Sequence, residues 1–334
     1  MVARQLANGC HFLAADKTPE WFAARRLGLG ASEAPAVCGL SKWETPLDVW
    51  ARKTGRLDPK EATPIMDLGT HMEAPIFDRI EQTFPIAQRS PGLFRHKEIE
   101  CVLASPDGVL ADGRGLEFKV TSDRNEEIGD GPDELLSTWL VQAQQQMAVC
   151  GFPAVVFAVV ILPDAVRTWI LEQLGAQAAA HVIGTGVRNG TIPLRHWTIE
   201  RHSQFVDGII NRDVEFWEHV TNNTPPAVDW EHARACQAVR NAFRDVYREG
   251  SFVGLNDEDL TLWEARTKYK SQISEAEKFC KRADAELLLK IKDANGGILP
   301  NGDVIKKAVV SESFIEAYTR ASYSYLRQTK GPKK

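Results

Sequence analysis

The sequence predicts an α/β (α+β) fold in which helices flank a central mixed β-sheet, followed by a helical C-terminal extension. Three observations support this expectation. The 334 residues have an ordinary globular composition, with 43% hydrophobic and 25% charged residues. Apolar residues recur at helical spacing in the first part of the chain, and strand-like alternation begins near residue 98. The longest purely apolar run, 154–162, is shorter than the ~20 residues that cross a bilayer.

The front of the chain is predicted to be helical. Ser32, which is followed by Glu33, is predicted to start a helix. A second helix is expected from Thr45 to Thr54, where a glycine follows. Apolar residues at steps of three and four predict a third helix between 68 and 83.

The pattern then changes to strands. Residues 98–104 and 116–120 alternate in polarity, and the Asp-Gly and Gly residues between them predict a tight reversal. The later predicted elements are a helix over 135–150, strands over 154–161 and 166–171, helices over 204–222 and 257–293, and a hairpin turn at 300–303. This order indicates a layered fold with a mixed sheet.

Two consecutive prolines at 225 and 226 predict a boundary between a core, 1–224, and a mainly helical extension, 225–334, with a small hairpin and a basic tail. The net charge is −5, but residues 255–334 carry 15 Lys and Arg against 12 Asp and Glu. Five basic residues and no acids follow from Arg320 onward. An acidic protein can still hold DNA in a local basic groove, so bulk charge does not exclude a nucleic-acid partner.

The sequence lacks the patterns typical of several kinds of functional site. The six cysteines are far apart and include no CxxC pair, which argues against a disulfide framework, a zinc knuckle or an iron–sulfur cluster and favours reduced thiols. The glycine-rich stretch near residue 28 lacks the third glycine of a dinucleotide-binding loop. No GxxxxGK[ST] motif is present, so ATP-driven translocation is not expected.

The segment from Asp107 to Lys119 is the strongest candidate for a chemical site. On the predicted hairpin, Asp107 ends one strand and Glu117 and Lys119 lie on the next. Side chains alternate along a strand, so Glu117 and Lys119 share a face and Phe118 points the other way. A hard divalent cation is a natural partner for carboxylates set among apolar residues. A surface hairpin with an exposed Glu117–Lys119 pair is the alternative, and this pattern alone does not exclude it.

Four sequence blocks, in order, make the chain resemble the PD-(D/E)XK nuclease superfamily and, within it, the bacteriophage lambda exonuclease/YqaJ-type viral recombinases. The blocks are Trp21 and Arg25 with Ala31-Ser32-Glu33, the GTHME segment at 69–73, the SPDGVLADGRGLEFK segment at 105–119, and Gln142-Ala143-Gln144 with Met147. The resemblance covers about residues 15–175. The C-terminal third carries no recognisable motif.

The resemblance implies a metal centre with named ligands. Asp107 and Glu117 would bind the catalytic metal together with the backbone carbonyl of Phe118, and Glu73 would complete the site. Lys119 would orient or help to deprotonate the attacking water. Gln144 would form a hydrogen bond near that lysine or the scissile phosphate. Gln142 lies two residues away on the same helix, faces another side, and is expected to be structural.

The resemblance also implies that Arg25 and Ser32 bind the terminal 5′-phosphate of the substrate strand. An arginine fork matches phosphate geometry, and a serine near a helix start adds its hydroxyl to backbone N–H groups. The neighbouring Arg26 is an alternative to Arg25, and Ser32 has the alternative role of a helix cap. Lys42 and Trp43, in the loop after this block, are candidates for separating the strands.

The activity implied is that of a Mg²⁺-dependent 5′-to-3′ exonuclease. It would degrade one strand of linear double-stranded DNA to mononucleotides and leave a 3′ single strand for phage-type single-strand-annealing recombination. Two Mg²⁺ ions are expected, with Mn²⁺ able to substitute. The implied context is a homo-oligomeric ring, with a trimer favoured, an annealing-protein partner, no membrane, and the cytoplasm of a bacterial host carrying the phage or prophage. The alternatives are an endonuclease with the same metal site and a DNA-end-binding adaptor that recruits the annealing protein.

Overall fold

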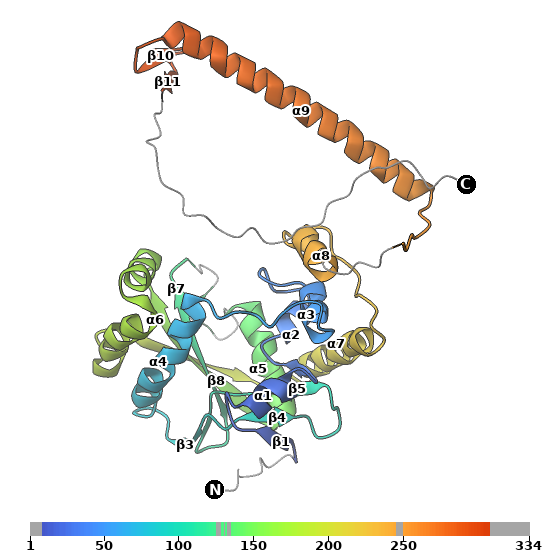
Figure 1. Ribbon diagram of the computed structural model, residues 1–334. Coiled ribbons are helices and arrows are strands. Elements are labelled where there is room, and N and C mark those ends of the chain that lie inside the picture. Colours follow the sequence, from blue (N-terminus) through green and yellow to red (C-terminus); the bar gives the residue numbers. More distant parts are fainter. Residues whose placement is uncertain (1–8, 125–127, 130, 132–134, 245–249, 308–334) are drawn as a thin grey trace. The chain divides into compact units, whose positions relative to one another are not determined.

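The computed structural model describes residues 9–124, 128–129, 131, 135–244 and 250–307. The chain divides into two compact units, 1–246 and 247–334 (Figure 1). The domain boundary expected at 224/225 stays a prediction, although helix α8 (Ala235–Phe243) lies within the first unit and packs into one of its cores. The basic tail from Arg320 onward lies outside the described residues.

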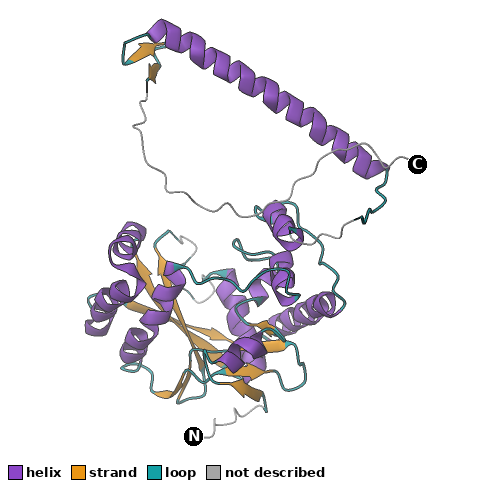
Figure 2. Ribbon diagram, in the orientation of Figure 1, coloured by secondary structure: helices purple, strands orange, loops and turns teal. Residues whose placement is uncertain are grey.

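A five-stranded mixed sheet forms the centre of the first unit, as predicted (Figure 2). Its order is β3-β6-β7-β8-β9, and the strands are β3 (Ile86–Arg89), β6 (Gly108–Leu110), β7 (Gly115–Ser122), β8 (Ala154–Leu162) and β9 (Leu194–Glu200). Only the β7–β8 pair is parallel among the described strands of this sheet. A parallel pair needs a long crossover connection, and helix α5 (Ser137–Cys150) provides it.

Helices cover both faces of this sheet. Helices α4 (Pro64–Ile80) and α6 (Asp164–Asn189) pack with Val156, Ala158 and Val160 of β8, whereas α5 packs with Val155 and Phe157 from the opposite face. Because β8 is buried on both sides, its sequence is continuously apolar. The α/β layering expected from the sequence is therefore confirmed.

A second, four-stranded sheet corrects one expectation about the 105–119 segment. Its order is β1-β4-β5-β2, and the strands are β1 (His11–Ala14), β4 (Leu93–Arg95), β5 (Val102–Ala104) and β2 (Leu29–Gly30). The strand predicted at 98–104 is thus β5 and belongs to this sheet, so it is not the first strand of the hairpin. The hairpin is formed by β6 and β7, and the chain crosses between the sheets at 105–107, where Pro106 has no N–H to continue a ladder.

The short front helices begin at residues that their caps explain. Helix α1 (Pro19–Arg25) has Thr18 as its N-cap, and α3 (Pro46–Lys53) begins with a capping box between Thr45 and Asp48, close to the predicted 45–54. The expectation for Ser32 as a helix start is wrong. Helix α2 (Ala34–Val37) follows Glu33, which forms no side-chain cap, and Ser32 lies in the turn before it.

The strand predicted at 166–171 is also wrong, because these residues lie in the first half of α6. Val166 and Trp169 are exposed while Ile170 packs against the core, which is a helical and not an alternating pattern. Asp164 in the first turn accepts a hydrogen bond from Arg167, an i,i+3 pair that favours the helix. A short apolar run does not distinguish the two structures by itself, and α6 bends at Gly175, whose φ is 73°.

Two later helices agree with the sequence, whereas α8 was not expected. Helix α7 (Ser203–Thr221) and the long α9 (Asp257–Ile291) match the predicted 204–222 and 257–293, and an Asn256–Asp259 capping box starts α9. Strands β10 (Gly296–Ile298) and β11 (Val304–Lys306) form the expected small hairpin. Of the helices in the described part of the chain, none combines the length and apolarity needed to span a membrane.

Helix α7 carries a buried carboxyl group, Asp213, that is fully inaccessible to solvent. Neither of its carboxylate oxygens has a hydrogen-bond partner among the described residues. Burial, and next the charge of Glu33, raise the pKa of Asp213 well above its ordinary value. The thiols of Cys38 and Cys101 have pKa values raised to about 11 by burial and by the charge of Asp213.

We predict that Asp213→Asn weakens the pH dependence of stability. Between the ordinary aspartate pKa and the raised pKa of Asp213, the folded state holds a proton that the unfolded chain has lost, so wild-type stability falls as the pH rises through this range. The asparagine variant has no such group. Thermal unfolding from about pH 5 to about pH 8 should show a smaller loss of Tm in this variant than in wild type. Asp207→Asn, at an exposed position of the same helix, should behave like wild type.

Candidate active site

The hairpin β6–β7 brings Asp107, Glu117 and Lys119 together. Gly108 pairs with Leu116, so Asp107, one residue before β6, lies beside the start of β7. The Asp107 Oδ2 accepts a hydrogen bond from the Phe118 N–H at 2.6 Å, and Lys119 Nζ donates to Glu117 Oε1 at 2.6 Å. Glu117 is only 5% exposed, so the pair is not the surface ion pair of the alternative interpretation.

Phe118 points to the other face, as the strand period requires. Its ring packs edge-on against Phe77 of α4, with 4.5 Å between centroids. This contact anchors β7 on the α4 side and leaves Glu117 and Lys119 directed toward α5. The shared face of Glu117 and Lys119 is therefore a consequence of alternation and of Phe118 burial together.

Helix α5 supplies two glutamine side chains to the hairpin, and they are not the one expected. Gln142 donates from Nε2 to Glu117 Oε1 at 2.5 Å and accepts from Lys119 Nζ at 2.9 Å. Gln146, one helical turn later, donates to Glu117 Oε2 at 2.7 Å. Together the two amides hold both oxygens of the Glu117 carboxylate.

Gln144 does not contact Lys119, which was one of the two positions expected for it. It donates to the Glu200 carbonyl at 2.8 Å and accepts from the His202 N–H at 2.9 Å, so it fastens β9 and the start of α7 to α5. Residues two apart on a helix are about 200° apart around its axis. Gln142 and Gln146 share a face at i,i+4 spacing, and that spacing is the sequence signal that identifies Gln146.

Glu73 reaches the site from α4, and a lysine that sequence reasoning missed accompanies it. Lys17 Nζ donates to Glu73 Oε1 at 2.7 Å. Burial alone lowers the pKa of Lys17, but the hydrogen bond and charge of Glu73, with the charges of Asp16 and Asp107, raise it above its ordinary value. Lys17 is adjacent to α1, has a positive φ of 58°, and lies 56 residues from its partner, so no local pattern indicates the contact.

The electrostatics of this acidic cluster favour a cation. Burial, and next the charge of Glu117, raise the pKa of Asp107 well above its ordinary value, although Lys119 and the Phe118 N–H act in the opposite direction. Two carboxylates in one buried site have the charge and oxygen donors that suit a hard divalent ion such as Mg²⁺. Within the described ranges, no three His, Cys, Asp or Glu side chains form a common metal-binding group. Lys119 and Lys17 instead donate hydrogen bonds to Glu117 and Glu73.

A second cluster contains the predicted phosphate ligands. Arg25 Nη2 donates to Ser32 Oγ at 3.0 Å, so the two residues do come together. The guanidinium carbon of Arg25 lies 4.8 Å from the Trp21 ring centroid, and a Cβ on Gly30 would lie 2.8 Å from Arg25 Nη2. The aromatic ring and the bare glycine backbone therefore define the position of this guanidinium.

A buried ion pair between Lys53 and Glu33 holds the backbone next to the Arg25–Ser32 pair. Lys53 Nζ donates to Glu33 Oε2 and to the Arg25 carbonyl, each at 2.8 Å, and Glu33 Oε2 also accepts from the Gly30 N–H at 2.9 Å. Burial raises the pKa of Glu33, but the charges of Lys53 and Arg25 outweigh it and lower this pKa below the ordinary value. Glu33 is therefore ionised at neutral pH. Through Lys53 of α3 and the Gly30 N–H of β2, it connects these two elements to the end of α1.

Trp21 connects this cluster to the acidic site. Its Nε1 donates to Ser105 Oγ at 3.2 Å, and Ser105 stands two residues before Asp107. The arginine stacked on Trp21 is thus adjacent to the segment that positions the carboxylates. Lys42 and Trp43 lie elsewhere, in the exposed loop before α3, and the Trp43 side chain is 80% exposed.

Comparison with known proteins confirms the resemblance inferred from the sequence. Residues 20–153 match the family described as the YqaJ-like viral recombinase domain. Over 301 residues the chain is 25% identical to the uncharacterized protein YqaJ of Bacillus subtilis (strain 168), covering 87% of this chain and 84% of that protein.

Solved structures show a more distant similarity. An alkaline exonuclease, LHK-Exo, from Laribacter hongkongensis is 22% identical with a TM-score of 0.44, over 62% of this chain and 94% of that one. A phage related exonuclease from Haemophilus somnus 129PT is 12% identical with a TM-score of 0.41, over 59% of this chain and 96% of that one.

Proposed function

We propose that this chain, which carries a YqaJ-like viral recombinase domain over residues 20–153, is a Mg²⁺-dependent exonuclease that degrades the 5′-ended strand of linear duplex DNA. It releases mononucleotides and leaves a 3′ single strand for an annealing protein. The observation that carries this proposal is the link through Trp21 between the Arg25–Ser32 pair and the Asp107 segment. An anion site next to a carboxylate site is what cleavage close to a phosphorylated end requires.

The carboxylate site is proposed to hold the metal and position the water. Asp107, Glu117, Glu73 and the Phe118 carbonyl are the proposed metal ligands. Bound Mg²⁺ supplies an acidified water and neutralises charge on the phosphate during hydrolysis. Lys119 Nζ lies where it can donate to the attacking water or a phosphate oxygen, and Gln142 fixes that nitrogen through its Oε1. Gln142 and Gln146 are therefore positioning residues, in place of the role expected of Gln144.

The cluster at Arg25 and Ser32 is proposed to bind the terminal 5′-phosphate. The Arg25 guanidinium offers a planar fork, and the Ser32 hydroxyl already lies within hydrogen-bond distance of it, so a phosphate can be held by both. An endonuclease has no need of such a pocket. This feature favours an exonuclease over an endonuclease and over a DNA-end-binding adaptor.

The proposal extends to the surroundings of the reaction. Lys42 and Trp43 separate the strands at the duplex end, because they are exposed in the loop that follows the phosphate cluster. A homo-oligomeric ring, a trimer, keeps the enzyme on DNA without ATP. Residues 1–224 form the nuclease core, and 225–334 form the extension. The 3′ strand passes to an annealing protein in the cytoplasm of a bacterial host.

Digestion of end-labelled linear duplex tests the proposal, with and without 5′-phosphate and in Mg²⁺ or EDTA. We expect mononucleotide release that needs Mg²⁺ and is faster from phosphorylated ends. Internal cuts that ignore the end would support the endonuclease, and tight end binding without cleavage would support the adaptor. In the same assay, Lys42→Ala and Trp43→Ala should slow digestion of blunt duplex, and wild-type rates in both variants would contradict the strand-separation role.

A further inference from the structure

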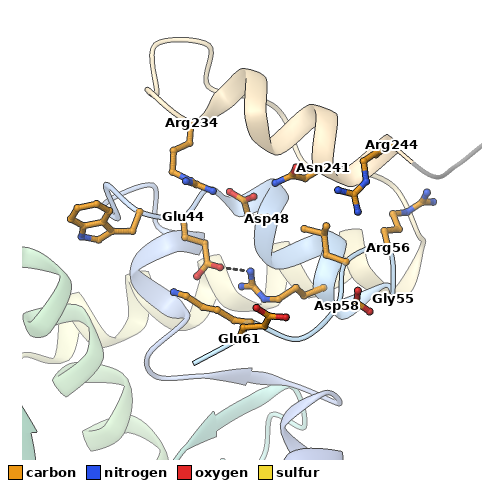
Figure 3. Close-up of a pocket in the computed structure, with 13 residues that line it drawn as sticks. Glu44, Asp48, Gly55, Arg56, Asp58, Glu61, Arg234, Asn241 and Arg244 are labelled. Atoms are coloured by element: carbon orange, nitrogen blue, oxygen red, sulfur yellow. Dashed lines mark ion pairs between the residues drawn. The ribbon is translucent and has the colours of Figure 1, made fainter. Parts of the chain in front are cut away.

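A pocket on another face of α3 than the phosphate cluster is used above only through Trp43, the proposed strand-separating residue that lines it. It has a volume of about 450 Å³ and lies between α3, the turn that follows it, and α8 (Figure 3). Arg56 and Asp58 enter from the turn after α3, while Arg234, Asn241 and Arg244 enter from α8 and its two ends.

One arginine of the pocket keeps a donor available. The Nε atom of Arg234 is buried and has no hydrogen-bond partner among the described residues. The Arg56 guanidinium lies 4.7 Å from the Trp50 ring centroid and 5.7 Å from that of Phe243, so it packs at the C-terminal end of α8, whereas Arg234 lies at the N-terminal end (Figure 3). A buried arginine with an unused donor suits a phosphate group.

The charge of the pocket favours an anion with hydrogen-bonding groups. Of the described residues, five basic and four acidic side chains line it. Glu44 forms an ion pair with Arg52, and Asp48 accepts both the N–H and the hydroxyl of Thr45. The basic side chains exceed the acidic ones by one. The carboxylates of Asp58 and Glu61 can accept hydrogen bonds at a base edge, and the Asn241 amide can accept or donate them.

An exposed aromatic residue offers a surface on which the base of a nucleotide can stack. Trp43 lines the pocket and is 80% exposed. Stacking of a base on an aromatic ring is independent of sequence, and single-strand binding sites combine such rings with basic side chains along the backbone. The cavity combines basic side chains, hydrogen-bonding groups and an exposed tryptophan. This combination suits a nucleotide better than it suits a simple anion.

The place of the pocket on α3 indicates which strand would enter it. Lys53 contacts Arg25 and Glu33, whereas the preceding residue, Arg52, lines the pocket. Neighbouring helix residues project about 100° apart, so α3 presents different faces to the phosphate cluster and the pocket. The digested strand has its 5′ end at Arg25 under the proposed function, which leaves the pocket to the other strand.

We propose that this pocket binds a nucleotide of the retained 3′ strand, with its phosphate at Arg234 and its base on Trp43. The inference rests on the proposed function for the choice of strand. The pocket holds single-stranded DNA after the strands have been separated, and this holding opposes reannealing behind the advancing enzyme.

Fluorescence anisotropy in EDTA with a labelled oligothymidylate of about 12 nucleotides and a 5′-hydroxyl tests binding without cleavage. Arg234→Gln should weaken binding about tenfold and reduce the salt slope by about 0.7. Trp43→Ala should weaken it by a similar factor, and Trp43→Phe should restore it. Arg212→Gln, which removes an exposed arginine of α7, should leave binding unchanged, and thermal unfolding checks the fold of every variant.

Two further binding measurements identify the ligand. A duplex with a 3′ tail of about 12 nucleotides should bind more tightly than a blunt duplex, and Arg234→Gln should remove this difference. Unchanged oligonucleotide affinity in Arg234→Gln would overturn the inference. Competition by dTMP as strong as that by the oligonucleotide would also overturn it, because the pocket would then hold the mononucleotide product. Hydrolysis of phosphorylated duplex is measured in parallel, so a wild type that binds the tail without cleaving DNA contradicts only the proposed nuclease function.

Discussion

Asp107→Asn is expected to slow hydrolysis of 5′-phosphorylated linear duplex by about a thousandfold. Asp107 and Glu117 are the two carboxylates on the hairpin, and the amide removes one of the charges proposed to hold Mg²⁺. A metal ion contributes several kcal/mol to stabilisation of a phosphoryl transition state, and about 4 kcal/mol corresponds to three orders of magnitude in rate. The asparagine Oδ1 can still accept the hydrogen bond from the Phe118 N–H, so the hairpin keeps its geometry.

The same variant is expected to be at least as stable as wild type in EDTA. Burial and the Glu117 charge raise the pKa of Asp107, which means that its ionised form is unfavourable in this site. Adding Mg²⁺ should raise the Tm of wild type through binding to the folded state, and it should raise the Tm of Asp107→Asn much less. This second readout distinguishes loss of a metal ligand from a damaged fold.

Asp112→Asn is the matched control, because Asp112 lies at the turn of the same hairpin and is exposed beside Arg114. It should retain the wild-type rate and the wild-type response to Mg²⁺. An Asp107→Asn enzyme that kept more than about a tenth of the wild-type rate would remove Asp107 from the metal site and with it the proposed mechanism.

The hairpin chemistry was predictable because strand alternation leaves little freedom. Once Glu117, Phe118 and Lys119 lie on one strand, their faces follow from the period of two. Helix rotation is different, since Gln142 and Gln144 differ by about 200° and only packing decides which of them meets the strand. The contact of Gln144 with Glu200 and His202 depends on β9 and α7, which lie more than 50 residues away in sequence.

Long-range contacts and short apolar runs account for the other differences. No sequence pattern joins Lys17 to Glu73, because the contact depends on how the segment before α1 passes α4. The short apolar run at 166–171 fits both a strand and a helix, and only the burial of Ile170 on one side of α6 distinguishes them.

Gly30 leaves the space that the Arg25 guanidinium occupies, so a side chain at position 30 is expected to displace it. Gly30 has no positive φ, so an alanine is compatible with its backbone, but the added Cβ would lie 2.8 Å from Arg25 Nη2 and 3.3 Å from its Cζ. The Lys53–Glu33 pair fixes the Arg25 backbone and the Gly30 N–H, and Trp21 lies against the guanidinium. The guanidinium therefore has to leave the position from which it reaches Ser32.

Gly30→Ala is expected to lower the preference for 5′-phosphorylated over 5′-hydroxyl ends by about 10- to 100-fold. A charge-assisted hydrogen bond contributes about 1.5–3 kcal/mol, which corresponds to this range. KM for phosphorylated duplex should rise while kcat at saturation and the rate on 5′-hydroxyl ends stay near wild type, a division that general destabilisation does not produce. Gly208→Ala, where a Cβ meets no atom within 4 Å, is the control and should keep the preference. Arg25→Gln removes the guanidinium without a new Cβ and should reproduce the loss, so an unchanged preference in both variants would show that the phosphorylated end is recognised elsewhere.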